Sequence, residues 1–444
     1  MSYSYQAHLS DLNKLIWGKG PISSEIFQRW CQGFHFSSDE PSALIQSSGG
    51  PCAILATVQA VILREILFEE KLDMSNLEED RCIDLLIDSI LDIMLLVVGE
   101  DGPMCYCWAH WSEPDDSSDE ARTEPESGTE KFFQGLKFIH ITSQDELHGV
   151  IMSLTPQLQS SYGVLCFLYS VLFTHGMLAL RKGMGDESET LIDPTHGHAS
   201  QSLINLLLTG QMTPNLFDGV RSISDYSLTG ILKQPKTGFL TLFEALHYCE
   251  AGWYLKNPSY PIWVLGSETH LTVLASPQPE LVSDESSHTD QKATLHQAEL
   301  EFARLSVGQD PDTGFIQSER LAELLQNLQI SYTDQSLNGV KQKLDPEDLG
   351  VILKEPFLLH FFPKEMSKRC SQISNFKLIH YNGLQKSNPN GQVRYQTGEA
   401  RILDPTEELA EIGTGDISPI QRCLQTKWPT IRIKWENDQT PSLN

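Results

Sequence analysis

The chain is organised around Gln46–Leu63, whose sequence is QSSGGPCAILATVQAVIL. The pair Gly49-Gly50 interrupts regular structure, and Pro51 is suited to the first position of a helix. The run that follows is apolar almost all the way round, so the sequence predicts a helix buried in the core. Cys52 then lies in the first turn, where unpaired backbone N–H groups and the helix dipole favour a thiolate.

A cysteine at this position has two interpretations. As a nucleophile, Cys52 would use the helix start to stabilise its thiolate, and the adjacent glycines would let a substrate backbone approach the sulfur. As a packing residue, it would be one more small apolar side chain in the core. The stretch itself does not choose between them.

The composition describes a globular chain with an acidic surface. Its 444 residues are 40% hydrophobic and 20% charged, which predicts one large domain and a smaller one. The net charge of −27 argues against nucleic acid or an anionic membrane and is compatible with a basic partner. Nine cysteines without regular spacing predict reduced thiols in the cytosol or nucleus. No apolar run has the length of a membrane span, and Met1–Ser10 shows no signal peptide.

Hydrophobic periodicity predicts the elements around the central helix. The acidic, serine-rich stretch Ser112–Glu130 has too few apolar residues to repay the entropy of ordering, so we expect a disordered loop. Tyr162–Phe173 is a buried element whose type the periodicity leaves open. The other expected elements are helices in Leu9–Phe36, Cys82–Val98, Ser143–Leu154 and Thr237–Cys249, and a strand at Lys137–Ile141.

Two clusters of polar ligands are weak candidates for a site. Cys105, Cys107 and His110 lie close together, but without a second pair nearby they make a poor zinc signature. His196 and His198 flank Gly197 in a turn, where we expect them to hold the loop by hydrogen bonds rather than to act in a cleft.

The second important stretch is Tyr260–Ser276, YPIWVLGSETHLTVLAS. Two runs of β-branched, aromatic and leucine residues flank a short polar segment, which predicts a strand, a turn and a second strand. His270 begins the second strand, at the edge beside the turn, and a histidine there can reach a neighbouring cleft. By itself, a histidine in this position is more often a surface or half-buried imidazole than a catalytic one.

A thiol at a helix start and a histidine at a downstream strand are the arrangement of papain-like cysteine hydrolases. The imidazole takes the thiol proton and later protonates the leaving amine. Gln46, six residues before Cys52, is placed to stabilise the oxyanion if the glycines fold its amide back toward the sulfur. The group that orients His270 stays open among its sequence neighbours Ser267, Glu268, Thr269 and Thr272.

An internal repeat follows a polar linker at Pro277–Gln291. Asp310–Ile316 and Asp345–Ile352 both place a glycine two residues before an isoleucine, which is the layout of paired EF-hand loops with the isoleucines joined across the pair. The calcium ligands are missing, because Arg320 and Pro356 stand where the bidentate glutamate belongs. We therefore expect a packing module without metal.

The C-terminal part is expected to return to the first domain. The predicted strands are Phe376–Tyr381, Val393–Tyr395, Ala400–Leu403 and Ile431–Trp435, with the acidic stretch Asp404–Ile417 between them. The resulting division is a catalytic domain at 1–290, an EF-hand-like pair at 291–365 and strands completing the catalytic domain at 366–444.

Four segments closely resemble the MINDY deubiquitinases, and the resemblance covers essentially the whole chain. They are Gln46-x-x-Gly49-Gly50-Pro51-Cys52, Gly266-x-Glu268-x-His270, Asp193-Pro194-x-x-Gly197-His198 and Arg422-Cys-Leu-Gln-Thr-Lys-Trp428. The resemblance implies an α+β, papain-like cysteine protease fold with an inserted all-α EF-hand-like helical pair. It maps the nucleophile to Cys52, the general base and acid to His270 and the oxyanion glutamine to Gln46, with no cofactor and no metal.

The implied activity is hydrolysis of isopeptide bonds at the ubiquitin C-terminus, with preference for the proteasome-targeting lysine linkage. The implied partners are ubiquitin and polyubiquitin chains, bound by a monomer without nucleic acid or membrane. The family also implies a place in the nucleus and cytoplasm and a link to apoptosis. Two alternatives remain, a transglutaminase-like acyl transferase and a catalytically silent ubiquitin-binding or EF-hand-type adaptor.

Overall fold

The structure is a computed structural model, and it divides the chain into two compact units. One unit is 1–282 together with 375–444, and the other is 283–374. Most of the loop predicted at Ser112–Glu130 and of the acidic stretch Asp404–Ile417 lies outside the described residues. The structure describes residues 5–98, 105–113, 128–185, 189–223, 226–282, 295–306, 315–347, 349–362, 374–403 and 417–444.

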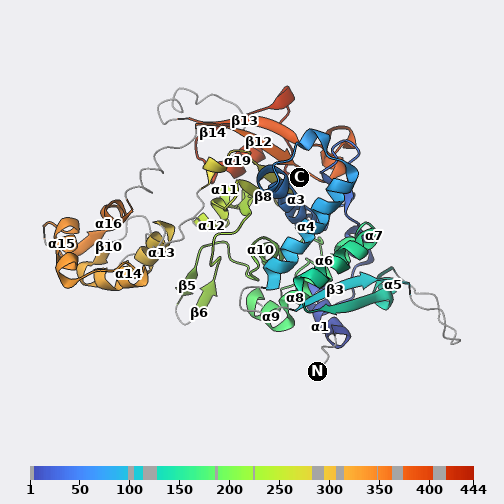
Figure 1. Cartoon of the computed structure of the whole chain (residues 1–444), viewed down its shortest axis with the longest axis horizontal. Coiled ribbons are helices and arrows are strands. Elements are labelled where there is room, and N and C mark those ends of the chain that lie inside the picture. Colours follow the sequence, from blue (N-terminus) through green and yellow to red (C-terminus); the bar gives the residue numbers. More distant parts are fainter. Residues whose placement is uncertain are drawn as a thin grey trace. The chain divides into compact units, whose positions relative to one another are not determined.

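A six-stranded sheet organises the larger unit (Figure 1). Its strand order is β14-β13-β12-β9-β8-β7; β7 and β8 run parallel, and the other neighbours are antiparallel. Since β12 pairs with β9, the C-terminal segment and the predicted hairpin share one sheet. The strands are β7 Gly238–Thr241, β8 Ile262–Gly266, β9 Leu271–Ala275, β12 Asn375–Tyr381, β13 Gln396–Ile402 and β14 Ile431–Trp435.

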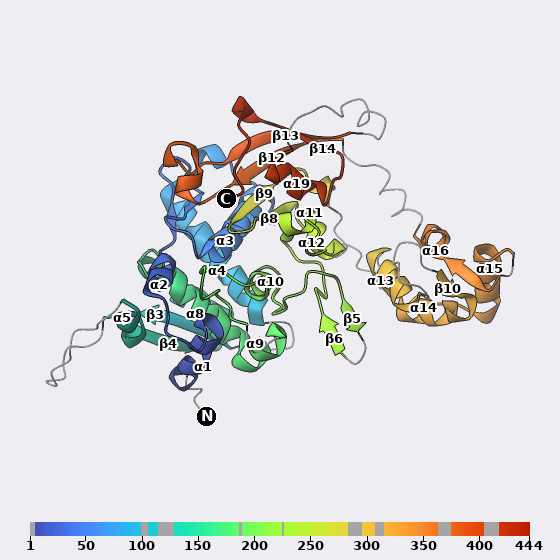
Figure 2. The same cartoon turned by 180° about the vertical axis from the view of Figure 1, so that it is seen from behind.

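The central helix α3, Cys52–Arg64, lies between this sheet and the helical part of the unit (Figure 2). It packs on β8 and β9 on one side and on α4, Glu79–Val98, on the other. All thirteen of its residues are buried, which confirms the predicted core helix. The helix begins one residue later than expected, because Pro51 is its N-cap.

Further layers follow α4 and complete the core. Helix α8, Gly163–His175, packs on α4, and strand β3, Tyr106–Trp111, packs on α8 and pairs antiparallel with β4, Leu136–Ile141. The buried element predicted at Tyr162–Phe173 is therefore a helix. Among the described residues no single helix is long and apolar enough to cross a membrane; α8 and α9, Met177–Met184, bent by 90°, reach that length and composition only together.

The rest of the larger unit consists of short elements around these layers. The helices and the strand predicted in Leu9–Phe36, Ser143–Leu154 and Lys137–Ile141 are confirmed. The elements are α1 Tyr5–Trp17, α2 Ser24–Trp30, β1 His35–Phe36, β2 Leu44–Ile45, the π-helix η1 Glu65–Glu69, η2 Met74–Asn76, β3 Tyr106–Trp111, α5 Gly128–Gly135, β4 Leu136–Ile141, α6 Gln144–Ser153, α7 Thr155–Leu158, α9 Met177–Met184, α10 Gln201–Thr209, β5 Val220–Ile223, β6 Tyr226–Thr229, α11 Leu242–Ala245, α12 Trp253–Lys256, η3 Pro279–Leu281, η5 Gln385–Ser387, η6 Pro389–Gly391, α19 Pro419–Gln425 and η7 Glu436–Asp438.

Two element predictions in this unit are wrong. The helix expected over Thr237–Cys249 is strand β7 followed by the single turn α11, which Thr241 caps. The backbone at Gly238 approaches Leu255 so closely that a side chain would clash, and parallel pairing with β8 overrides the helical pattern. The strand expected at Val393–Tyr395 is unpaired, and pairing with β12 begins only at Gln396.

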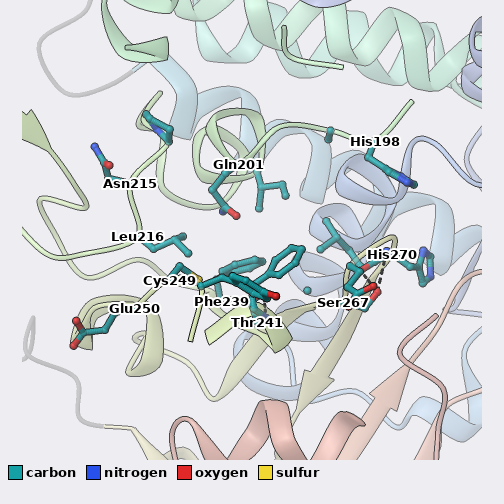
Figure 3. Close-up of a pocket in the computed structure, with 18 of the residues that line it drawn as sticks. His198, Gln201, Asn215, Leu216, Phe239, Thr241, Cys249, Glu250, Ser267 and His270 are labelled. Atoms are coloured by element: carbon teal, nitrogen blue, oxygen red, sulfur yellow. Dashed lines mark hydrogen bonds between the residues drawn. The ribbon is translucent and has the colours of Figure 1, made fainter. Parts of the chain in front are cut away.

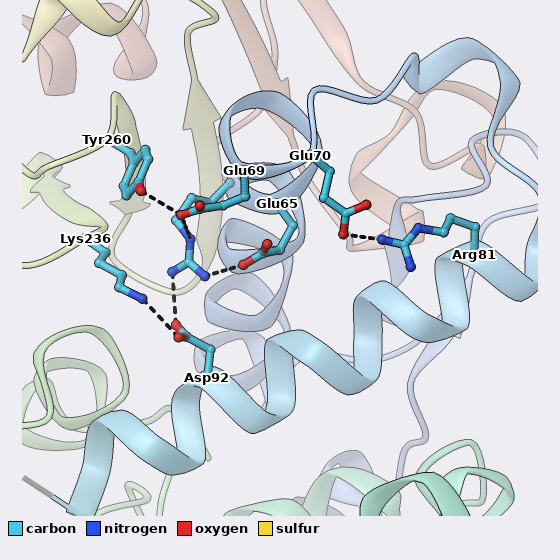
Figure 4. Close-up of polar contacts among 8 residues, drawn as sticks. Glu65, Glu69, Glu70, Arg81, Asp92, Lys236 and Tyr260 are labelled. Carbon is cyan, nitrogen blue, oxygen red and sulfur yellow. Dashed lines mark hydrogen bonds and ion pairs between the residues drawn. The ribbon is translucent and has the colours of Figure 1, made fainter. Parts of the chain in front are cut away.

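Ion pairs and hydrogen bonds anchor the C-terminal end of α3 (Figure 4). Arg64, buried at the last position of the helix, donates to Asp92 of α4 at 3.0 Å and to Glu65 at 2.5 Å. Asp92 also accepts from Lys236 at 3.0 Å, and Tyr260 donates to Glu69 at 2.6 Å. This network joins α3, α4 and the segments that lead into β7 and β8.

The smaller unit is built from helices and one pair of strands. The strands β10 and β11 pair antiparallel with Ile316 opposite Ile352, which is the pairing predicted for the two isoleucines. The unit is therefore not entirely helical. Asp345, at the first position of the second loop, caps the backbone N–H groups of Leu349 and Gly350. The elements are α13 Leu295–Leu305, β10 Phe315–Gln317, η4 Ser318–Arg320, α14 Leu321–Asn327, α15 Asp334–Leu344, β11 Val351–Leu353 and α16 Lys354–Phe361.

Candidate active site

The start of α3 opens into a cavity of about 830 Å³ in the larger unit. Cys52 and His270 both line it, although 218 positions separate them along the chain. His198, from the turn before α10, lies at the same end as His270, whereas Asn215 and Glu250 lie at the opposite end (Figure 3). The structure thus brings together two of the three predicted site residues in one cavity wall.

The Cys52 thiol is almost fully buried, with 4% of the residue exposed. Burial raises the pKa of this thiol to about 11, although backbone N–H groups of Leu271 and Ala53 act in the opposite direction. The thiol donates to the carbonyl of Gly50 at 3.8 Å. The helix start therefore does not make Cys52 a thiolate in this structure, because desolvation is the larger effect.

His270 is a neutral imidazole with a defined tautomer. Burial lowers its pKa to about 4, and 5% of the residue is exposed, which is less than expected for a residue at the edge of a strand. Its Nε2 lies 2.9 Å from Oδ1 of Asn382. That oxygen also accepts from the Leu384 N–H, while Nδ2 of Asn382 donates to the Ser442 carbonyl. Nε2 therefore carries the proton, and Nδ1 is left with a lone pair that can accept one.

Asn382 is the orienting residue that sequence reasoning missed. It directly follows β12, and the pairing of β12 with β9 brings it next to His270. Three of the candidates near His270 in sequence make other hydrogen bonds: Ser267 accepts the His270 backbone N–H at 3.0 Å, Thr269 donates to Asn444 and Thr272 pairs with His380. A polar residue at the end of a strand was the available signal, but its significance depends on strand pairing.

Gln46 is buried in the loop before α3 and is tied to the segment after Asn382. Its backbone N–H donates to Gly383 at 2.7 Å, and its carbonyl accepts from Gln385 at 3.2 Å. Its side-chain amide donates to the Ser48 carbonyl at 2.8 Å. One segment, 382–385, therefore holds both the imidazole of His270 and the backbone of Gln46. The role of Gln46 at an oxyanion stays a prediction.

Helix α2 holds the two loops at this end of the cavity. Trp30 donates from Nε1 to the Gly197 carbonyl at 3.0 Å, and its ring packs against Gly50. Gly50 has φ = 141°, and a Cβ there would lie 3.2 Å from the Trp30 ring, so a side chain would be strained. Gln32 accepts from the Ser47 backbone N–H at 2.9 Å and stabilises the same loop.

The structure also describes the two clusters that are weak candidates in the sequence, Cys105 with Cys107 and His110, and His196 with His198. The described residues contain no group of three or more histidine, cysteine or acidic side chains that would hold a metal ion. In the turn before α10, Asp193 holds the loop by accepting from the Thr195 and His196 backbone N–H groups. The ring of His198 instead lines the cavity, and its Nδ1 has no hydrogen-bond partner among the described residues.

Comparison with known proteins first defines a class, the thiol-dependent deubiquitinating enzymes. The family described as "Deubiquitinating enzyme MINDY-3/4, conserved domain" matches residues 15–304, which include Cys52 and His270. The chain belongs to this family. It is 41% identical to "Ubiquitin carboxyl-terminal hydrolase MINDY-3" of Bos taurus and 40% identical to that of Homo sapiens, in each case over 98% of this chain and 99% of the relative.

A more distant relative covers the same extent of this chain. The "Ubiquitin carboxyl-terminal hydrolase MINDY-3 homolog" of Drosophila melanogaster is 35% identical over 98% of this chain and 83% of its own length. No solved structure matches the chain. The similarity therefore extends through the C-terminal segment that carries Asn382, beyond the residues that the family description matches.

Proposed function

We propose that this chain is a cysteine-type deubiquitinase that hydrolyses isopeptide bonds at the ubiquitin C-terminus. The observation that carries the proposal is that Cys52, at the start of a buried helix, lines one cavity with His270, which Asn382 orients. Membership of the MINDY-3/4 family and similarity to ubiquitin carboxyl-terminal hydrolases support the choice of substrate. The arrangement of thiol helix and histidine hairpin is proposed to be papain-like.

In the acylation step, Nδ1 of His270 takes the Cys52 proton as the sulfur attacks the carbonyl carbon of the terminal glycine of ubiquitin. The carbonyl π electrons move to oxygen, and the amide of Gln46 and the backbone N–H of Cys52 are the proposed donors to this oxyanion. Gln46 has a second side-chain N–H besides the one that donates to Ser48. Collapse breaks the C–N bond, and the imidazolium gives its proton to the leaving lysine amine.

The deacylation step repeats this sequence with water. His270 takes a proton from water, the oxygen attacks the thioester carbon, and the sulfur leaves and regains the proton from the imidazolium. Ubiquitin departs with a free carboxylate. Asn382 would hold the imidazole in the correct tautomer through both steps, because its Oδ1 accepts from Nε2 while Nδ1 exchanges protons with the reactants.

The shape of the cavity suits an extended peptide that ends in small residues. Gly266 lines it beside Phe239 and Thr241, so the wall next to the hairpin carries no side chain at that point. Ubiquitin ends in two glycines preceded by arginines, and Glu250 and Glu268 line the same cavity. We propose that these carboxylates attract the arginines of the tail and that bulkier peptides are excluded.

The finer parts of the proposal concern linkage and context. We propose a preference for polyubiquitin of the proteasome-targeting lysine linkage, action as a monomer and a location in nucleus and cytoplasm, all on the strength of the family resemblance. The smaller unit is proposed to be a degenerate EF-hand-like pair that packs without calcium. A panel of diubiquitins of every lysine linkage, cleaved in parallel, tests the preference directly.

The decisive experiment labels the thiol with ubiquitin that carries a C-terminal electrophile. Wild-type protein should form a covalent adduct, and Cys52→Ala should form none and should not cleave polyubiquitin, because the acyl intermediate needs the sulfur. His270→Ala should also stop turnover. Gln46→Ala should lower kcat by about a hundredfold with ubiquitin binding retained. Cleavage of polyubiquitin by Cys52→Ala would overturn the proposal.

The same experiment separates the other candidate functions. Binding of the probe without adduct formation would favour a silent ubiquitin-binding adaptor. Addition of an amine acceptor during turnover would identify an acyl transferase if the amine, rather than water, received most of the ubiquitin. We expect hydrolysis, because membership of the MINDY-3/4 family supports a hydrolase.

A further inference from the structure

The turn that carries His198 is rigid without any help from its ring. The Asp193 backbone N–H donates to the His198 carbonyl at 2.8 Å, and the Gly197 N–H donates to the Asp193 carbonyl at 2.8 Å. From the side of α2, Arg29 donates to the His196 carbonyl at 2.9 Å and Trp30 to that of Gly197. The backbone therefore fixes where the His198 side chain is presented.

The ring of His198 is presented to the cavity at the end where the chemistry is proposed. It lines the wall together with Cys52 and His270, and it lies at the same end of the cavity as His270 (Figure 3). Its Nδ1 is buried, yet it has no hydrogen-bond partner among the described residues. A buried polar nitrogen without a partner is unfavourable, so its presence beside a reactive site calls for a ligand that supplies the partner.

Two other roles fit the surroundings less well. A general base needs a group that fixes its tautomer, and His270 has Asn382 for this purpose, whereas no residue that the structure describes bonds to Nδ1 of His198. A structural role in the turn is filled by Asp193 and by α2, as described above. What remains is contact with the molecule that enters the cavity.

The chemistry of the ring limits what this molecule presents to it. Burial lowers the pKa of His198, and the neighbouring Arg29 and His196 act in the same direction, so the imidazole is neutral. A neutral imidazole donates one hydrogen bond and accepts one, which matches the alternating N–H and C=O groups of an extended peptide. It does not match a phosphate or carboxylate, which would favour a charged partner.

We propose that His198 is a substrate-binding residue whose Nδ1 hydrogen bonds to the main chain of the peptide tail next to the scissile bond. This inference rests on the proposed function, since it assumes that an acyl tail occupies the cavity. Together with the hairpin that carries His270, His198 then grips the end of the tail that must be aligned with the Cys52 sulfur.

The test compares four variants in the full-length protein. His198→Ala removes the hydrogen bond, and His198→Asn restores an amide atom at the position of Nδ1. His198→Gln places its amide too far along the side chain. Thr195→Ala, at an exposed position of the same turn, is the matched control, because the His196 ring stacks on that of His198. Each is assayed for its second-order rate of reaction with the ubiquitin electrophile, for KM and kcat on diubiquitin, and for alkylation of Cys52 by iodoacetamide.

We expect His198→Ala and His198→Gln to react with the ubiquitin electrophile about tenfold more slowly than wild type, and to lose activity on diubiquitin mainly through a higher KM. The rate at which iodoacetamide alkylates Cys52 should be unchanged. His198→Asn should recover most of the rate, and Thr195→Ala should match wild type. A normal rate in His198→Ala, equal defects in His198→Asn and His198→Ala, or a parallel loss of iodoacetamide reactivity would each overturn the inference. If wild-type protein failed to react with the ubiquitin electrophile, the proposed function itself would fall.

Discussion

At the scale of single residues, the cysteine and the histidine are both uncharged at neutral pH. Burial lowers the pKa of His270 to about 4 and raises that of Cys52 to about 11, so the stable pair is thiol and imidazole rather than thiolate and imidazolium. In the proposed mechanism, the proton transfer that creates the nucleophile then takes place in the complex with substrate. Nδ1 of His270 can accept the thiol proton, because the hydrogen bond to Asn382 keeps the proton of the neutral imidazole on Nε2.

This protonation state predicts how the free protein reacts with a small alkylating reagent. Because the thiolate fraction grows tenfold for each pH unit below the thiol pKa, the iodoacetamide rate at Cys52 should keep rising from pH 6 to pH 10. A thiolate–imidazolium pair would instead give a plateau across neutral pH. Mass spectrometry of the modified Cys52 peptide distinguishes this thiol from the other cysteines, and a plateau would contradict the neutral pair.

The contact between Asn382 and His270 yields a second prediction. Asn382→Ala should lower kcat about tenfold to a hundredfold with little change in KM, because the imidazole loses its orienting acceptor but the cavity wall is kept. Steady-state kinetics on diubiquitin measure this. Asn388→Ala is a control nearby in the chain, since Asn388 bonds the Asn382 and Leu384 carbonyls rather than the imidazole. Equal losses of kcat in both variants would show that Asn382 acts only through the fold of the segment.

The sequence predicts part of this site, and there is a physical reason why the other part cannot be predicted from it. Cys52 and His270 are found by their local contexts, a helix start and a strand edge, which a single chain segment reveals. Asn382 becomes meaningful only when β12 pairs with β9, and strand pairing is not encoded in a local pattern. The protonation states were also hidden, because desolvation depends on what packs over the thiol and not on its position in the helix.

At the scale of elements, helix α3 is fixed at both ends by different means. The loop before its first turn is supported by Trp30 and Gln32. Its last residue, Arg64, is held by the hydrogen bond from its buried guanidinium to Asp92. The side chain of Arg64 is 3% exposed, and Asp92, its partner on α4, is 27% exposed. A charge buried to this degree stabilises the fold only while its partners remain in place.

The anchoring of α3 is testable by removing the guanidinium. Arg64→Met should lower the free energy of unfolding by about 2–4 kcal/mol, because Glu65 loses its ion pair with Arg64 and the partly buried Asp92 keeps only Lys236 as a cationic partner. Arg81→Met is the matched control: Arg81 pairs with Glu70 where both side chains are about one-third exposed, so its loss should change stability by less than about 1 kcal/mol. Urea unfolding of both variants makes the comparison, and similar values for the two would contradict a special role for the buried network.

The elements were predictable where one periodicity dominates the segment. Helix α3 and the β8–β9 hairpin carry strong local patterns that predict them correctly, whereas the pattern of Thr237–Cys249 predicts a helix although the segment contains strand β7. That segment is apolar enough for either structure, and the choice is made by β8, which pairs with it in parallel. In the smaller unit, the spacing of the two isoleucines correctly predicted the β10–β11 pair.

At the scale of the whole molecule, buried histidines couple stability to pH. His380 in β12 is fully buried and accordingly has its pKa lowered to about 3, and His270 behaves in the same way. Both must be neutral in the folded chain, while in the unfolded chain they bind protons near the ordinary imidazole pKa of about 6.5. The unfolded state therefore binds more protons below that value, and stability is present above about pH 6.5 and is lost as the pH falls toward 4.

This linkage predicts a loss of about 2 kcal/mol per buried histidine between pH 7 and pH 5. Carboxyl groups whose pKa is raised by burial, such as Glu40 and Asp88, act in the opposite direction, so the informative quantity is a difference between variants. His380→Phe keeps a ring in the core but removes the titration; it should lose less stability than wild type over this range, by about 2 kcal/mol, even if its stability at pH 7 is lower because Thr272 loses its partner. Urea unfolding at pH 7, 6 and 5 measures both slopes. Identical slopes would mean that His380 binds its proton equally well in the folded and the unfolded chain. The acid sensitivity would then have to come from the carboxyl groups of the protein.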